Sequence, residues 1–125
     1  MGFEGFKEAG TATVKLASHP VSQAVDVFHV VNGLKIGLNV KARDRIEGYL
    51  EEIDGDYFDW YIVDEDNMVE CLKGENFDYI DGDENVQASK VNCDIPNDGP
   101  WYLMLDLGAR RYDRKVKVNL RILRN

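Results

Sequence analysis

Hydrophobic and polar residues alternate along several short stretches of this chain, as they do in β-strands that bury one face. Alternating runs occupy 13–16, 91–95 and 116–122. Two further segments, 59–67 and 98–106, each hold a short aromatic and aliphatic run beside turn residues. The pattern predicts an all-β fold, an antiparallel β-sandwich with at most one short helix.

Asn32 and Gly33 predict a tight hairpin, because a type I′ turn needs positive φ at both central residues. The pair lies between two alternating runs, 25–31 and 34–40. In a two-residue hairpin His29 would face Ile36, and seven of the eight side chains on that face would be aliphatic. We therefore expect a core face here, with His29 as a hydrogen-bonded structural residue.

The segment 44–53 allows two interpretations. Its isoleucines and leucine have helical spacing, and Asp44 with Glu47 could cap a helix. Gly48 opposes a helix, since glycine inside one costs about 1 kcal/mol relative to alanine. The sequence leaves a short helix and a strand as equal alternatives.

Composition fits one domain over residues 1–125, because 44% of the residues are hydrophobic. The formal net charge is −8. Fifteen acidic residues and a single base, Lys73, lie between Glu47 and Glu84, whereas 110–124 hold seven of the fifteen Lys and Arg. This acidity argues against nucleic-acid binding, and no apolar run approaches the ~20 residues of a membrane span.

The sequence does not decide the cellular compartment, and the oxidation state of the two cysteines depends on it. No basic segment followed by an apolar one marks a secretion signal, so we expect a cytosolic protein, or an exported one whose signal was removed. Cys71 alternates with Val69 and Cys93 with Val91, which predicts buried free thiols. In an exported protein a bridge between them would close a loop of about twenty residues and stabilise by about 3 kcal/mol.

Three segments resemble GOLD-type β-sandwich domains. They are the aromatic strand with its acidic turn at 58–67, the turn and aromatic strand at 95–106, and the alternating strand at 116–120. The turn at Gly99 and Pro100, placed before an aromatic strand, is also similar to prepeptidase C-terminal domains of bacterial secreted enzymes. The resemblance implies a jelly-roll or GOLD-like sandwich that acts as a non-catalytic binding module, often appended to other domains or to membrane-anchored proteins.

Two acidic clusters carry the oxygen ligands that calcium takes. The clusters are Asp54, Asp56 and Asp59, and Asp81, Asp83 and Glu84. Neither matches a helix-flanked EF-hand loop, and a calcium site needs about six to eight oxygens brought together. Solvated acidic loops are the alternative, and calcium is the only cofactor that the sequence suggests.

Aromatic side chains suggest a stacking platform for a sugar or a peptide. If Trp60 and Trp101 face the core, strand alternation turns Tyr61 and Tyr102 outward. Tyr112 would complete such a platform. Tryptophans in the core are the interpretation that a sandwich favours.

Basic residues near the C-terminus suggest a stripe that steers acidic partners or a second copy of the chain. Its candidate members are Arg110, Arg111, Arg114, Lys115, Lys117 and Arg121. The alternative is that Glu51, Glu52 or Asp66 neutralises the stripe within the same molecule. Oligomeric state stays open.

No catalytic signature is present. The only histidines are His19 and His29, and neither has the sequence context that would pair it with Cys71 or Cys93 as a nucleophile and base. We therefore predict a non-catalytic module that binds a protein partner. The alternatives are a calcium-assisted carbohydrate-binding module and a small hydrolase.

Overall fold

The computed structural model describes residues 10–14, 21–30, 33–108 and 114–124, with side chains from residue 33 onward. Nine strands and one helix are found within these ranges. They are β1 (Gly10–Val14), β2 (Val21–Val30), β3 (Gly33–Leu38), β4 (Arg45–Glu52), β5 (Phe58–Asp64), α1 (Glu65–Leu72), β6 (Asp81–Val86), β7 (Ala88–Asp94), β8 (Trp101–Asp106) and β9 (Arg114–Leu123).

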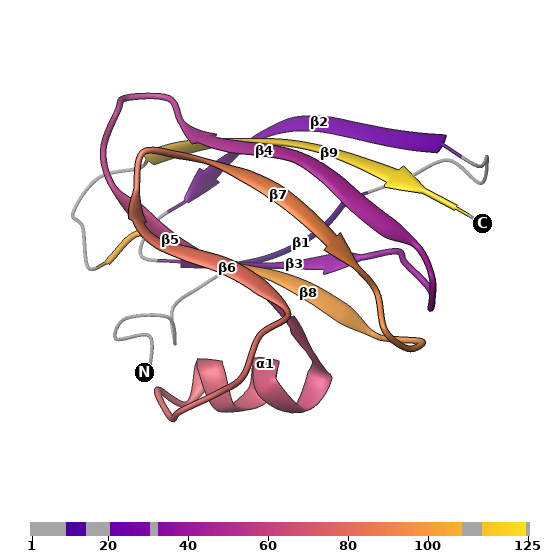
Figure 1. Cartoon of the computed structure of the whole chain (residues 1–125). Helices are drawn as coiled ribbons and strands as arrows, with labels where there is room; N and C mark the ends of the chain where they lie inside the picture. Colours follow the sequence, from indigo (N-terminus) through magenta and orange to yellow (C-terminus); the bar gives the residue numbers. More distant parts are fainter. Residues whose placement is uncertain (1–9, 15–20, 31–32, 109–113, 125) are drawn as a thin grey trace.

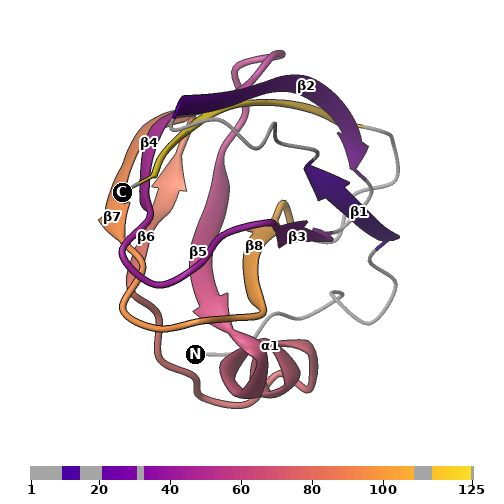
Figure 2. The ribbon, with the colours of Figure 1, turned by 90° about the vertical axis from the view of Figure 1, so that its right-hand side faces the viewer.

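The strands form two packed sheets, which confirms the predicted β-sandwich (Figure 1). One sheet has the order β1-β3-β8-β5-β6 and the other has the order β2-β9-β4-β7. Figure 2 shows the two layers from the end, with the turn from β6 to β7 joining them on one side. Strand pairs in the described chain are antiparallel, except that β1 runs parallel to β3.

The core lies between the sheets and is built from alternating positions. Trp60, Ile62, Trp101 and Leu103 all point into it, as strand alternation predicts. On β9 every second residue from Val116 to Ile122 is buried as well. Burial of these apolar side chains is the main stabilising contribution to such a fold.

The hairpin predicted around Asn32 and Gly33 is wrong, because β2 and β3 belong to different sheets. β2 pairs with β9 and sets His29 beside Lys115, whereas β3 pairs with β8 and sets Ile36 beside Leu103. Both sheets turn an alternating apolar face to the same core, so alternation alone does not identify the partner strand. The side chain of His29 lies outside the described residues, and its structural role stays a prediction.

Residues 44–53 form a strand rather than a helix, since β4 covers Arg45–Glu52. Gly48 on β4 has a φ of 154°, and a Cβ there would lie 1.9 Å from the carbonyl oxygen of Asn119 on β9. The glycine is therefore required by a close approach of two backbones. The helical spacing of the aliphatic residues in this segment is coincidental.

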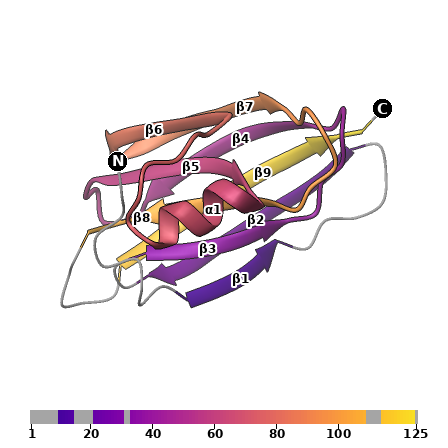
Figure 3. The ribbon, with the colours of Figure 1, turned by 90° about the horizontal axis from the view of Figure 1, so that it is seen from below.

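The single described helix lies where a polar turn was expected after β5. Asp64 caps it, and its carboxylate accepts a hydrogen bond from the Asn67 amide at 3.0 Å. The helix crosses the outer face of the five-stranded sheet over β5 and β8 (Figure 3). Between the helix and the sheet a second hydrophobic cluster contains Tyr61, Val63, Met68, Cys71 and Met104.

Both cysteines are free, as predicted for buried thiols. Cys93 on β7 is partly buried and packs against the core. Cys71 is fully buried, but it belongs to α1, and Val69 is exposed. The strand-like alternation assumed for residues 69–71 was therefore wrong, although it predicted the burial of the thiol.

Candidate functional site

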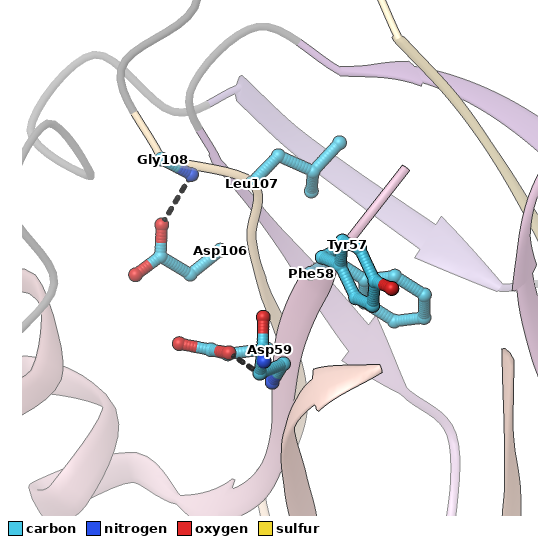
Figure 4. A pocket seen from close by; sticks show the side chains of 7 residues that line it. Tyr57, Phe58, Asp59, Asp106, Leu107 and Gly108 are labelled. Atoms are coloured by element: carbon cyan, nitrogen blue, oxygen red, sulfur yellow. Dashed lines mark hydrogen bonds between the residues drawn. The ribbon is translucent and has the colours of Figure 1, made fainter. Parts of the chain in front are cut away.

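A pocket opens where β5 begins and β8 ends (Figure 4). Its volume is about 190 Å³, and it is open to solvent. The residues that line it are Tyr57, Phe58, Asp59, Asn85, Asp106, Leu107 and Gly108. Two strand ends and the neighbouring edge strand β6 thus supply its walls.

Sheet pairing brings two carboxylates to this pocket. Asp59 on β5 and Asp106 on β8 are directly opposite in the antiparallel register, so they share the outer face of the sheet. The Asp106 carboxylate accepts a hydrogen bond from the Gly108 amide at 2.9 Å. Figure 4 shows the two carboxylates on one side of β5, and the rings of Tyr57 and Phe58 on the other.

A β-bulge shapes the opposite wall of the pocket. The pairing of β5 with β6 shifts between Phe58 and Trp60, and Asn85 on β6 has a φ of 55°. Asparagine tolerates this left-handed conformation better than most residues. Its backbone amide donates a hydrogen bond to Asp59 at 2.7 Å. Bulges frequently accompany functional sites, where they redirect side chains.

The electrostatic environment of Asp59 is unfavourable for its charge. Burial raises the pKa of the Asp59 carboxyl, and the nearby Glu84 carboxylate raises it further. The hydrogen bond from Asn85 acts in the opposite direction. A positive group placed in the pocket would favour the charged form of Asp59 and lower its pKa.

In the first predicted calcium cluster, the Asp56 carboxylate lies 3.8 Å from the Arg114 guanidinium. The backbone amide of Asp54 donates a hydrogen bond to the Glu52 carboxylate. Among the described residues, no three His, Cys, Asp or Glu side chains gather closely enough to hold a metal ion. Asp59 lines the pocket, whereas Asp54 and Asp56, its neighbours in the predicted cluster, do not.

The second acidic cluster lies on β6. Asp81 accepts hydrogen bonds from the amides of Gly82 and Asn92, and Asp83 accepts one from Glu84. Glu84 accepts one from the Tyr61 hydroxyl at 2.5 Å. These bonds show how the strand end is held, and calcium binding stays a prediction.

The aromatic platform does not form as predicted. Tyr61 faces away from the core, as alternation requires, but it is only 1% exposed, because α1 and the following loop cover it. Its ring contacts Phe77 and Tyr79 at centroid distances of 5.0 and 4.8 Å. Burial and the bond to Glu84 raise the pKa of Tyr61. Tyr102 is half-buried, and Tyr112 lies outside the described residues.

The basic stripe is only partly present. Lys115 and Arg121 are exposed, and Lys117 lies opposite Glu51 with its ammonium 5.6 Å from the ring centre of Tyr49. Arg114 is fully buried, so its predicted place in an outward stripe is wrong. Arg110 and Arg111 lie outside the described residues.

Neither thiol is prepared for nucleophilic chemistry. Burial raises the pKa of both Cys71 and Cys93 to about 12. Nucleophilic cysteines need the reverse, a pKa lowered toward or below neutrality. Both thiols are therefore protonated at neutral pH, which gives no support to a pairing of either thiol with a histidine base.

Sequence reasoning found Asp59 but missed the rest of the pocket. Asp106 carries the clearest signal, because a charged residue follows the apolar run of β8 at an outward position. Tyr57 and Asn85 had no such signal, since their roles depend on a bulge and on a loop that meets a distant strand end. Those features are set by tertiary pairing.

No protein-family model and no curated protein matches this sequence. The fold is similar to the pre-peptidase C-terminal domain of a collagenase from Bacillus anthracis, with a TM-score of 0.55 and 14% identity, covering 90% of this chain and 95% of that one. It is also similar to Aeromonas hydrophila PliG, a periplasmic inhibitor of g-type lysozyme, with a TM-score of 0.56 and 13% identity, covering 92% and 96%. At such identities the likeness concerns the fold. It confirms that part of the resemblance to prepeptidase C-terminal domains.

Within the described residues, no helix is both long enough and apolar enough to cross a membrane.

Proposed function

We propose that this chain is a non-catalytic module that binds a protein partner, and that a positively charged side chain of the partner enters the pocket. The observation that carries the proposal is the lining of that pocket, in which the carboxylates of Asp59 and Asp106 lie side by side on one side of β5 and Tyr57 lies at the other side of its beginning. Carboxylates form the strongest hydrogen bonds with Lys and Arg. The exposed ring of Tyr57 adds an attractive face for a cation.

The size of the pocket favours a single side chain. Its volume of about 190 Å³ is below the roughly 300–1,000 Å³ typical of pockets for small-molecule ligands and cofactors. A side chain presented by a partner needs less room, because the rest of the contact lies on the surrounding surface. Buried anchors of this kind commonly carry much of the binding energy of a protein interface.

The charge of the whole chain supports a basic partner. The net charge is −8, and the acidic segment 47–84 includes the residues beside the pocket. Asp83 and Glu84 on β6 are exposed, and Glu84 lies close enough to Asp59 to raise its pKa. Such an acidic surface raises the rate of encounter with positively charged proteins and disfavours nucleic acid.

The fold neighbours give further support for a protein partner. PliG is an inhibitor of g-type lysozyme, so a sandwich of this fold acts on another protein in that case. This makes a g-type lysozyme one specific partner to assay with the present chain. The protonated, buried thiols support a role without catalysis.

A peptide titration followed by NMR tests the proposal. Short uncharged peptides carrying one central Lys, Arg or norleucine are added to the full chain, and the amide signals of Asn85 and Gly108 are followed. We expect the Lys and Arg peptides to move both signals and norleucine to move neither, with weaker binding at high salt. No movement with cationic peptides at millimolar concentration would exclude the pocket as their site.

Two matched variants locate the interaction. Asp59→Asn removes a charge from the pocket but keeps a hydrogen-bond acceptor for the Asn85 amide, and it should weaken binding of the cationic peptides. Asp94→Asn removes an exposed charge on β7 of the other sheet and should leave binding unchanged. Equal losses from the two variants would mean that overall charge, rather than the pocket, attracts the peptides.

A carbohydrate ligand is the second candidate, since the half-exposed Tyr57 lines the same pocket as Asn85 and Asp59. An aromatic face next to amide and carboxylate groups also suits a sugar ring. Titration with monosaccharides, with and without calcium, separates the two candidates. Shifts with a sugar and none with cationic peptides would replace the first candidate by the second, and dependence on calcium would restore the predicted metal site.

A further inference from the structure

A buried guanidinium lies behind the candidate pocket. Arg114 begins β9, and its side chain is only 1% exposed. Its Nε donates to the Glu52 carboxylate at 2.9 Å, and Glu52 at the end of β4 is 2% exposed. The pair thus places opposite charges in contact within the sandwich.

The other guanidinium nitrogens reach two carbonyl groups from different parts of the chain. Nη1 donates to the Leu107 carbonyl at 2.8 Å, and Nη2 donates to the Tyr57 carbonyl at 2.6 Å. Leu107 follows β8 and Tyr57 precedes β5, and both line the pocket. One side chain therefore holds two walls of the pocket at a fixed separation.

We propose that Arg114 is the positioning residue of the pocket: by bridging the carbonyls of Tyr57 and Leu107, it sets the spacing of the walls and so selects which cationic side chain the pocket admits. The part of this inference that concerns selection of a cationic side chain rests on the proposed function. The wall geometry itself does not depend on any ligand.

Stability alone gives a weak reason for this arrangement. Removing a buried ion pair from water costs energy, and replacing such a pair by apolar residues is often neutral or stabilising. A guanidinium, however, offers five donors in a rigid planar fork, which a point charge such as lysine lacks. The bonds to two carbonyls in addition to Glu52 use that fork and fix the geometry of the pocket.

The test uses Arg114→Lys in the full chain. Lysine keeps the positive charge for Glu52, but its single nitrogen should not hold both carbonyls as the fork does. The amides of Phe58 and Gly108 belong to the same peptide groups as those carbonyls, so their NMR signals report on the two bonds. We expect both signals to move in the unliganded variant. Unchanged signals would overturn the inference.

Ile46→Ala is the matched control. This substitution removes core side-chain atoms near the other end of β4 and should lower stability without touching the pocket. It should leave the Phe58 and Gly108 signals and the peptide affinities as in the wild type. Arg114→Lys should weaken the preferred peptide about tenfold, the effect of roughly one lost hydrogen bond, and change the ratio of Lys to Arg affinity. Equal effects from both variants would reduce Arg114 to a purely structural residue.

The wild type supplies an independent measurement should Arg114→Lys fail to fold. Nη protons held by two carbonyls should give separate, slowly exchanging signals, and these should shift when a cationic peptide binds. A single averaged signal would show that the guanidinium rotates, which overturns the inference. Absence of peptide binding to the wild type overturns the proposed function alone, because the wall amides and Nη signals still test the role of Arg114.

Discussion

Outward-facing residues differ in their exposure to water between the two sheets. On the four-stranded sheet the cross-strand neighbours Glu51 and Lys117 remain accessible to water. On the five-stranded sheet the cross-strand neighbours Tyr61 and Met104 are 1% and 0% exposed, because α1 covers them. Strand alternation therefore predicts which side of the sheet a residue faces, but not whether another element shields that side from water.

The same contrast places the candidate site. On the four-stranded sheet opposite charges satisfy one another, as in the contact of Arg45 with Glu47 at 3.1 Å. On the five-stranded sheet the helix covers only part of the face, and the next outward pair, Asp59 and Asp106, lies at the pocket. The pocket end of the five-stranded sheet thus carries two neighbouring carboxylates, whereas Arg45 and Glu47 on the four-stranded sheet form an exposed ion pair.

The largest effect should come from breaking the four-stranded sheet itself. Gly48→Ala would place a Cβ 1.9 Å from the Asn119 carbonyl oxygen, so β4 and β9 would have to separate. We expect a loss of at least about 4 kcal/mol in the free energy of unfolding, or failure to fold. Gly74→Ala is the control, because its φ is also positive at 76° but nothing lies within 4 Å. It should cost about 1 kcal/mol in urea denaturation; similar costs would contradict the close approach.

Truncating matched outward residues tests the comparison directly. Met104→Ala removes a side chain beneath the helix and should cost about 2–5 kcal/mol, the usual range for methionine in a core. Lys117→Ala on the other sheet should change stability by about 0–1 kcal/mol, because the side chain loses only a contact of its ammonium with the Tyr49 ring at the surface. Thermal and urea unfolding measure both. A cost for Met104→Ala no larger than that for Lys117→Ala would mean that α1 does not seal this face in solution.

How far the sequence predicts the fold depends on which features are local. The inward positions of Trp60 and Leu103 follow from alternation, and the structure confirms them. Strand partners do not follow, because the runs before and after Asn32 are equally suited to either sheet, and they pair in different ones. Helix α1 was not predicted, because the acidic residues at its beginning are also typical of a polar turn after a strand.

The candidate site is less predictable than the fold for the same reason. Asp59 was identified as a possible ligand from its acidic neighbours along the chain, but its contacts in space are Asn85 and the end of β8. Arg114 was assigned to an exposed stripe because charged residues usually face water. Its burial depends on Glu52 and on two carbonyls that only the tertiary structure brings together.

A smaller effect should separate the tyrosines of the two outer faces. Tyr61→Phe removes the buried hydroxyl that donates to Glu84 and should cost about 1 kcal/mol, the usual net value of a hydrogen bond. Tyr49→Phe on the four-stranded sheet is the control, and this exposed tyrosine should change stability by less than about 0.5 kcal/mol. Chemical denaturation measures both variants. If Tyr49→Phe lowered the free energy of unfolding more than Tyr61→Phe, the assignment of a buried and an exposed outer face would be contradicted.

The smallest effect should be a gain in stability from the pocket carboxylate. Because burial raises the pKa of Asp59 in the folded state above its ordinary value of 3.8, folding favours the protonated form. Its stabilising contribution is present below pH 3.8 and is lost as pH rises through the raised folded pKa.

Asp59→Asn stays uncharged, so we expect its free energy of unfolding at pH 7 to exceed that of the wild type by a few tenths of a kcal/mol. Urea denaturation measures the difference. The difference should shrink as the pH falls toward 3.8. Glu51→Gln, which removes an exposed charge opposite Lys117 on the other sheet, should show no such gain. If Asp59→Asn instead lowers stability at pH 7, the carboxylate already has a compensating positive partner, and the pocket would be closed to a cationic side chain from outside.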